Sequence, residues 1–222
     1  MPSTIEAVIF DCDGTLVDSE HLGNVVLAEL ITAEGLALTS DEATRRFRGM
    51  RLSHCLSQLE TELGRPLPAT FIADFRRLSA EAFQTKLQPI PGANELIQSI
   101  SVPICVASSG PREKIELSLS LTGLLPHFAG RIFSSYEVGS WKPDAGLFLH
   151  AAASLGVHPS RCAVVEDSLP GIHAGLAAGM IVYAFQPTSL DPRLPPSVPV
   201  VRTLKALHDH LPQSNMNGRV DR

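Results

Sequence analysis

The sequence predicts an α/β fold: a parallel sheet with helices on both faces and a separate helical insertion. Two observations support this prediction. From residue 102 onward, short apolar segments alternate with helix-compatible stretches, the order that builds a parallel sheet covered on both faces. The first apolar segment lies near the amino terminus instead, and a long interval without a comparable strand signal follows it. Helices inserted after the first strand account for that interval.

Five segments have the composition of buried strands. They are short, apolar and rich in β-branched residues, and four of them lie after residue 100. They comprise residues 7–10, 102–107, 131–133, 163–165 and 181–185.

The interval between the first two strands shows helical periodicity. Apolar residues recur at helical spacing from Leu22 to Leu30 and from Phe71 to Ala82, and glycines such as Gly35 break the pattern into hairpins. We therefore expect a small helical bundle at residues 17–87. The remaining residues, 1–16 and 88–222, would form the sheet domain.

Composition excludes several classes of protein. The chain has 222 residues, 44% of them apolar and 18% charged, which suits a globular protein of one or two domains. A net charge of -5 without a Lys/Arg run argues against a nucleic-acid partner. No apolar run reaches the roughly 20 residues that span a bilayer. We expect a cytoplasmic monomer without membrane association, whose four scattered cysteines are reduced.

Two carboxylates follow the first predicted strand directly. Asp11 and Asp13 stand one residue apart after an apolar run, and buried charge is costly. We therefore expect them at the carboxyl end of the strand, where open α/β sheets bind ligands. A shared divalent cation would offset their repulsion and leave Asp11 available as a nucleophile, with Asp13 as the acid and base. An Asp-rich turn that merely ends the strand is the alternative.

A second acidic pair, Glu166 and Asp167, ends the apolar segment at 163–165. If the sheet brings this pair beside the first, the carboxylates complete an oxygen-rich site suited to Mg²⁺. The same residues, with Ser168, also fit the amino-terminal cap of the next helix. The two roles are compatible.

Hydroxyl groups and a lysine supply partners for phosphate. Ser108 and Ser109 lie where a buried strand meets a helix start, and backbone N–H groups at such a place favour phosphate. A simple helix cap explains the two serines equally well. Lys142 lies in a constrained loop before a helix, and it gains significance only from the other groups, because a lone lysine is usually solvated.

The order of these groups resembles the four motifs of the haloacid dehalogenase superfamily. The Asp-Cys-Asp-Gly-Thr run comes first, then the strand that ends at Ser108, then Lys142-Pro143, then Glu166-Asp167. The resemblance extends from Ile5 to about Phe185. It implies a Rossmann-like sheet core, and it identifies the insertion as a cap that closes over the site and reads the substrate.

The resemblance also implies a role for each matched residue. Asp11 would be the nucleophile that becomes phosphorylated, and Asp13 would be the general acid and base. Ser108 and Lys142 would hold the phosphate and the transition state. The cofactor would be Mg²⁺, with ligands from the set Asp11, Asp13, Asp167 and Glu166, in which Asp13 ligates through its backbone carbonyl and Glu166 supports the site.

The substrate implied is a small phosphorylated metabolite. Arginines that flank a glycine in the cap suit an anionic group on the leaving portion, although they also fit a solvated helix face. Within the superfamily the chain is similar to bacterial 6-phosphogluconate phosphatases in its Phe-Asp-Cys-Asp, Arg-Phe-Arg-Gly and Trp-Lys-Pro-Asp stretches. A phosphorylated sugar acid is therefore the leading candidate. The expected substrate contacts are Asp18, Glu20, Arg48, Gly49, Arg51 and Ser109.

Three rival functions remain at this stage. A β-phosphoglucomutase-like mutase would share the motifs, but many such enzymes carry a histidine where this chain has Gly23. A dehalogenase would not need the second acid, Asp13, because a halide leaves without a proton. A binding module that retains the fold would give no reason for intact Asp11, Asp13, Lys142 and Asp167.

Overall fold

The computed structural model describes residues 4–47, 49–188 and 190–214. These residues form a six-stranded parallel sheet with the order β3-β2-β1-β4-β5-β6. The parallel α/β architecture expected from the sequence is confirmed. The strands are β1 (Ala7–Phe10), β2 (Ile104–Ser108), β3 (Ile132–Ser134), β4 (Cys162–Glu166), β5 (Ile181–Phe185) and β6 (Val200–Val201).

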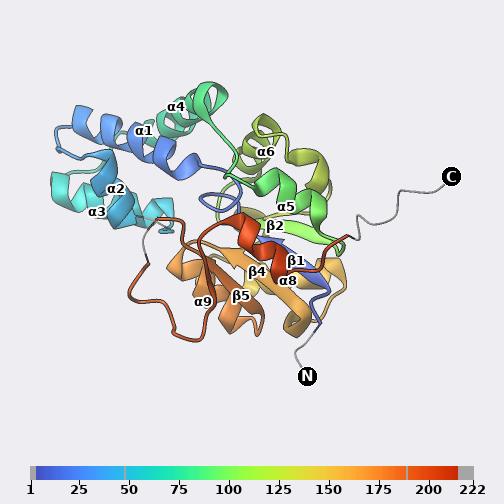
Figure 1. Cartoon of the computed structure of the whole chain (residues 1–222). Coiled ribbons are helices and arrows are strands. Elements are labelled where there is room, and N and C mark those ends of the chain that lie inside the picture. Colours follow the sequence, from blue (N-terminus) through green and yellow to red (C-terminus); the bar gives the residue numbers. More distant parts are fainter. Residues whose placement is uncertain (1–3, 48, 189, 215–222) are drawn as a thin grey trace.

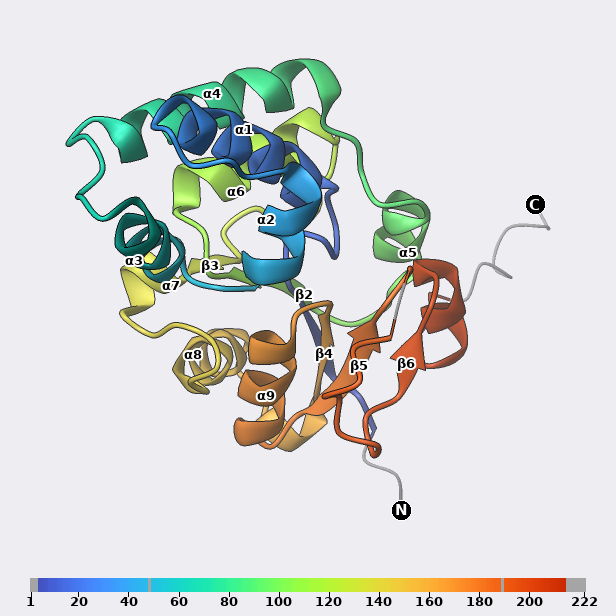
Figure 2. The ribbon, with the colours of Figure 1, turned by 90° about the vertical axis from the view of Figure 1, so that its left-hand side faces the viewer.

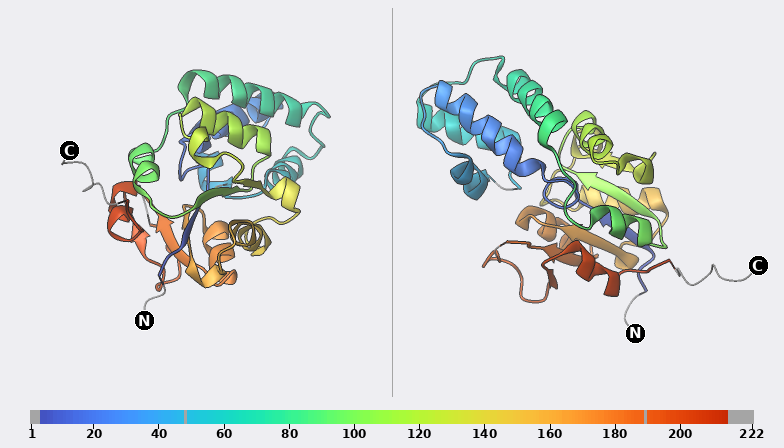
Figure 3. Two further views of the ribbon diagram at one scale, coloured as in Figure 1. Left: turned by 90° about the vertical axis from the view of Figure 1, so that its right-hand side faces the viewer. Right: turned by 45° about the horizontal axis from the view of Figure 1, so that its top comes forward.

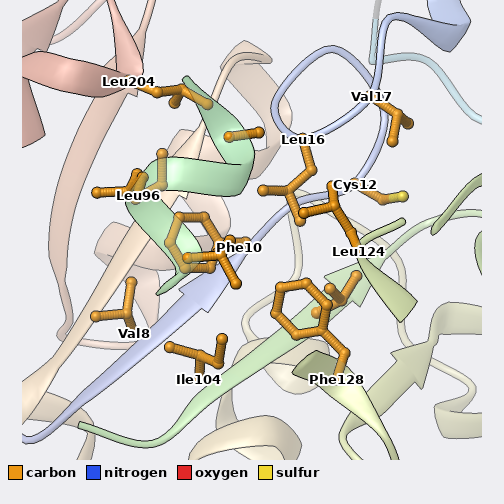
Figure 4. Close-up of a cluster of buried hydrophobic side chains, with 14 of the residues drawn as sticks. Val8, Phe10, Cys12, Leu16, Val17, Leu96, Ile104, Leu124, Phe128 and Leu204 are labelled. Carbon is orange, nitrogen blue, oxygen red and sulfur yellow. The ribbon is translucent and has the colours of Figure 1, made fainter. Parts of the chain in front are cut away.

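Strand β1 lies inside the sheet and sends alternate side chains to opposite faces. Val8 and Phe10 join one apolar cluster, and Ala7 and Ile9 join another. Figure 4 shows the first cluster, where the rings of Phe10 and Phe128 meet edge to face with centroids 6.5 Å apart. Both faces of the strand are buried, which explains its unbroken apolar sequence.

Helices cover both faces of the sheet (Figures 1 and 2). Helices α5 (Ala93–Ser99) and α6 (Arg112–Leu121) pack on the face that carries Phe10. Helices α8 (Gly146–Leu155) and α9 (Leu169–Ala177) pack on the face that carries Ile9. Shorter elements complete the described chain: α7 (Ser135–Val138), η1 (Leu125–Phe128), η2 (Pro159–Arg161) and η3 (Leu204–Asp209).

The insertion after β1 is helical and has an apolar core of its own. Residues such as Ile31, Phe47 and Leu59 are buried there, in a cluster separate from the two that cover the sheet. Figure 3 shows these helices gathered beyond one end of the sheet. They are α1 (Ser19–Ala33), α2 (Ser40–Phe47), α3 (Leu52–Leu63) and α4 (Phe71–Lys86). Within the described ranges, no helix combines the length and apolar character needed to cross a bilayer.

The strand order fixes where a ligand binds. From β1 the chain proceeds through β2 to β3 on one side, then crosses to β4 on the other side. The loops after β1 and β4 therefore diverge at the carboxyl end of the sheet and leave a crevice between them. The insertion lies at this end, directly after β1.

Candidate active site

Asp11 follows the last residue of β1 and is 6% exposed. Its Oδ1 accepts a hydrogen bond of 2.5 Å from the Lys142 Nζ. Burial raises the pKa of Asp11 well above its usual value, and the nearby Glu166 carboxylate adds to this rise, whereas Lys142 opposes it. The next side chain, Cys12, turns into the apolar cluster instead, as Figure 4 shows. This alternation places Asp11 in the crevice.

Lys142 lies in the loop before α8 and contacts two carboxylates of the acidic site. Besides Asp11, its Nζ donates to the Glu166 Oε2 at 2.5 Å. Burial alone would lower the pKa of Lys142, but Asp11 and Glu166 together raise it above its usual value. The ammonium therefore keeps its charge inside the site.

Glu166 ends β4 and uses both of its carboxylate oxygens. While Oε2 accepts from Lys142, Oε1 accepts from the backbone N–H groups of Asp167 and Ser168, at 3.1 and 3.0 Å. It also accepts from the Ser168 hydroxyl at 2.9 Å, and that hydroxyl caps α9 by accepting from the Gly171 N–H. Glu166 thus fixes the loop after β4 as well as Lys142.

Asp167 lies beside Asp11 and completes a carboxylate cluster. One carboxylate oxygen from each of Asp11, Glu166 and Asp167 lies within 4.8 Å of the others. Thr15 donates its hydroxyl to the Asp167 Oδ1 at 3.2 Å. The structure thus brings Asp11 together with the second acidic pair of the sequence, and the Lys142 ammonium contacts two of these three buried carboxylates. Three carboxylates at this spacing are a donor set that fits a divalent cation.

Asp13 points to the other side of the site, toward the insertion. Its Oδ1 accepts hydrogen bonds from the hydroxyl of Ser19, at the start of α1, and from the Lys114 Nζ in α6, the latter at 2.7 Å. Although burial would raise the pKa of Asp13, Lys114 and Ser19 lower it. Asp13 is therefore a carboxylate in this state.

Ser108, the last residue of β2, is buried at the same end of the sheet. Its hydroxyl accepts from the Gly110 N–H at 3.1 Å, and the Ser134 hydroxyl donates to the Gly110 carbonyl at 2.6 Å. These bonds hold the loop that leads into α6. Ser109 and Gly110 face the cavity described next.

A cavity of about 530 Å³ lies between the sheet and the insertion. Its walls include Asp11, Asp13, Ser108, Lys142 and Asp167 from the sheet side, and Glu20, Gly49 and Arg51 from the insertion. Asp18 is exposed and does not line the cavity, because it lies just before α1 with its side chain in solvent. Arg48 lies outside the described residues.

Several residues of this cavity were not expected from the sequence. Lys114, Arg76 and Tyr136 line it, although none lies in one of the four motifs. Lys114 is half-buried in the first turn of α6, and its partner Asp13 is distant in the sequence. The one local signal for Lys114 was a positive charge in the first turn of the helix that follows Ser108. Lysines on a protein surface commonly occupy such a position, so this signal does not indicate a site.

A comparison with protein families gives an independent result. The model of the haloacid dehalogenase-like hydrolases matches residues 5–179. The 6-phosphogluconate phosphatase of Escherichia coli strain K12 is 37% identical over 212 residues, which cover 95% of this chain and 93% of that protein. Hexitol phosphatase A of the same strain is 31% identical, with 84% and 82% of the two chains covered.

Solved structures agree with these sequence matches. A haloacid dehalogenase-like protein from Agrobacterium tumefaciens superposes with a TM-score of 0.80 at 33% identity, with 93% of this chain and 97% of that chain covered. A family hydrolase from Deinococcus radiodurans, solved with bound phosphate and sodium, gives 0.74 at 29% identity, with 94% and 95% covered. With its fold, its acidic site and these relatives in agreement, the chain belongs to the haloacid dehalogenase-like hydrolase family.

Proposed function

We propose that the chain is a magnesium-dependent phosphomonoesterase that acts on a small phosphorylated sugar or sugar acid, such as 6-phosphogluconate. The observation that carries the proposal is the convergence of Asp11, Asp13, Lys142 and Asp167 on one cavity at the carboxyl end of the sheet. A nucleophile, an acid and base, a fixed cation and a metal-binding cluster are the parts that phosphoryl transfer requires.

Asp11 and Asp167 are the proposed side-chain ligands of Mg²⁺, with the Asp13 backbone carbonyl beside them. Their all-oxygen donors suit this ion. Glu166 belongs to the same cluster, but its two oxygens already accept hydrogen bonds from Lys142 and from the loop after β4. Its proposed part is to orient Lys142 and that loop. When bound, the ion supplies positive charge that neutralises phosphoryl oxygens.

The proposed reaction has two steps that both use Asp11 and Asp13. Asp13 is a carboxylate in the structure, so it first has to take up a proton from solvent as the substrate binds. A carboxylate oxygen of Asp11 then attacks phosphorus in line, the bond from phosphorus to the ester oxygen breaks, and Asp13 gives that oxygen the proton. Asp13 then takes a proton from water as the water oxygen attacks the aspartyl phosphate. Inorganic phosphate leaves and Asp11 is restored. Lys142 and Ser108 hold the phosphoryl oxygens in both steps.

The helices at 17–87 are the proposed cap, and they supply the contacts that read the leaving portion. Glu20, Gly49 and Arg51 face the cavity from this side, and Ser109 faces them from the sheet side. An arginine there suits the carboxylate of a sugar acid. The named activities of the E. coli relatives, on 6-phosphogluconate and on hexitol phosphates, support this substrate class.

A phosphosugar mutase is the second candidate, and one observation weighs against it. Gly23 lines the cavity from α1, and a Cβ built there meets no atom within 4 Å. The position that often carries a histidine in the mutases is thus open space in this chain.

We further propose that the protein is a cytoplasmic monomer that acts on a small molecule and has neither a nucleic-acid nor a membrane partner.

Phosphate release from a panel of phosphorylated sugars, sugar acids and nucleotides tests the function. We expect release with Mg²⁺, loss of release with EDTA, and the highest kcat/KM on a sugar acid phosphate. Isomerisation of glucose 1-phosphate, measured in parallel, would show that the protein is a mutase rather than a phosphatase. Absence of both reactions would leave a binding module.

A further inference from the structure

A stacked pair joins the cap to the sheet domain next to Lys142. The guanidinium carbon of Arg51 lies 3.8 Å from the centroid of the Trp141 ring. Arg51 comes just before α3 in the cap, and Trp141 comes just before Lys142 in the sheet domain. Cation–π contacts extend to about 6 Å, so this one is close.

A second arginine makes a similar but longer contact beside it. The Arg76 guanidinium, from α4, lies 5.9 Å from the centroid of the Tyr136 ring. Tyr136 and Trp141 in turn meet edge to face, with centroids 5.7 Å apart. The sheet domain therefore presents an aromatic pair, and each ring receives one arginine of the cap.

Stacking leaves the hydrogen-bond donors of Arg51 available. A guanidinium stacks through its face, while its five N–H groups point outward in its plane. Three cap arginines away from the cavity, Arg46, Arg65 and Arg77, are paired with glutamates or aspartates, whereas Arg45 has no ion pair in the described part of the chain. Among the described residues, Arg51 has no carboxylate partner, and it lines the cavity whereas Trp141 does not.

An accessible arginine normally samples many rotamers, and ordering it on a ligand costs free energy. Arg51 is exposed, and its contact with the Trp141 ring restricts its side chain. We propose that Trp141 is a positioning residue, an inference that rests on the proposed phosphatase function. Trp141 holds Arg51 in place to bind an anionic group, such as a carboxylate, on the leaving portion of the substrate. Selectivity for sugar acids over sugar alcohols then depends on a residue outside the cavity.

Trp141 is the single tryptophan of the chain, so its fluorescence reports on the stack directly. Arg51→Ala is expected to change the intensity or wavelength of the emission. Arg45→Ala, an exposed cap arginine that does not line the cavity, is the matched control and leaves the emission as in wild type. Emission that is unchanged in Arg51→Ala overturns the proposal, whatever the substrate is.

Kinetics then test the link to selectivity. The substrates are 6-phosphogluconate and sorbitol 6-phosphate, which differ by a carboxylate in place of a CH₂OH group. Trp141→Leu is expected to raise KM for 6-phosphogluconate about tenfold and KM for sorbitol 6-phosphate much less. Trp141→Phe keeps an aromatic ring, and its KM for 6-phosphogluconate should stay close to that of wild type. In an Arg51→Ala background, Trp141→Leu adds little.

Equal effects on both substrates, or effects that add to those of Arg51→Ala, overturn the proposal, because Trp141 would then only support the Lys142 loop. Thermal unfolding identifies a variant that has lost its fold, and Trp141→Phe keeps an aromatic ring in that case. A wild-type enzyme that does not act on 6-phosphogluconate contradicts the proposed substrate instead, and the fluorescence experiment still decides whether the stack exists.

Discussion

Asp11 carries the chemistry of the proposed reaction, and a conservative change isolates it. Asp11→Asn keeps the size of the side chain but removes the nucleophilic oxygen. We expect turnover to fall to the detection limit, while thermal stability without Mg²⁺ stays close to that of wild type, since the variant loses both a lysine contact and the repulsion of neighbouring carboxylates. Activity above a trace would remove Asp11 as the nucleophile.

Arg51 tests the cap at the scale of one side chain. Arg51→Ala removes the guanidinium that faces the cavity. We expect KM for 6-phosphogluconate to rise roughly tenfold or more, because a charge-assisted hydrogen bond to a carboxylate is lost. KM for p-nitrophenyl phosphate, which has no carboxylate, should change less. Steady-state kinetics on the two substrates decide the point, and equal changes would contradict recognition by the cap.

Single residues also show where sequence reasoning ends. Asp11, Asp13, Lys142 and Asp167 stand in local patterns, since each follows a strand or precedes a helix, and the structure brings them together. Lys114 has no such pattern. The role of Lys114 depends on its ion pair with Asp13. The Lys114 Nζ lies 2.7 Å from the Asp13 Oδ1 because α6 packs beside the loop after β1.

At the scale of elements, the start of α9 is built around Glu166. A Cβ added to Gly171 would lie 1.9 Å from the Glu166 Oε2, the oxygen that holds Lys142. Glycine is normally unfavourable inside a helix by about 1 kcal/mol relative to alanine. We expect Gly171→Ala to be destabilising by about 1–3 kcal/mol nonetheless, because the buried carboxylate has to move.

Because Lys142 moves with Glu166, the same variant should lose activity at least about a hundredfold. Urea unfolding and kcat/KM measure the two effects. Gly23→Ala in α1 is the control, since its Cβ meets open space, and it should be as stable as wild type or more stable. If Gly171→Ala also matches wild type in stability and activity, Glu166 does not position Lys142.

The elements themselves were predictable to within a few residues. The second strand was expected at 102–107 but is Ile104–Ser108, because Pro103 has no N–H group to donate and Ser108 still pairs with Ser134 in β3. Strand β6 escaped the prediction altogether. It has two residues, Val200 and Val201, which is too short for any periodicity, and its pairing with β5 defines it.

At the scale of the whole molecule, the cap has an apolar cluster of its own, although Phe83 of α4 and Leu87 belong to a sheet cluster. Leu59 is fully buried in the cap cluster, and Leu119 of α6 is fully buried against the sheet. Each Leu→Ala change is expected to cost about 2–5 kcal/mol locally. Hydrogen exchange should then accelerate within α1 to α4 for Leu59→Ala, with β1 and β4 still protected.

Leu119→Ala is the reciprocal case, and it should weaken protection of the sheet first. Equal acceleration throughout the molecule in both variants would mean that cap and sheet unfold as one unit. The measurement therefore tests whether residues 17–87 are a domain, which the sequence suggested from a missing strand signal and which the separate cluster supports.

The position of β1 also bears on how the protein forms during synthesis on the ribosome. This strand is made before its partners in the sheet, β2 and β4, which begin at Ile104 and Cys162. The cap helices end at Lys86, so their cluster is complete while β1 still lacks both neighbours. Long-range strand pairing is slow to form. The nascent chain should therefore form the proposed cap before the sheet that carries the proposed catalytic residues.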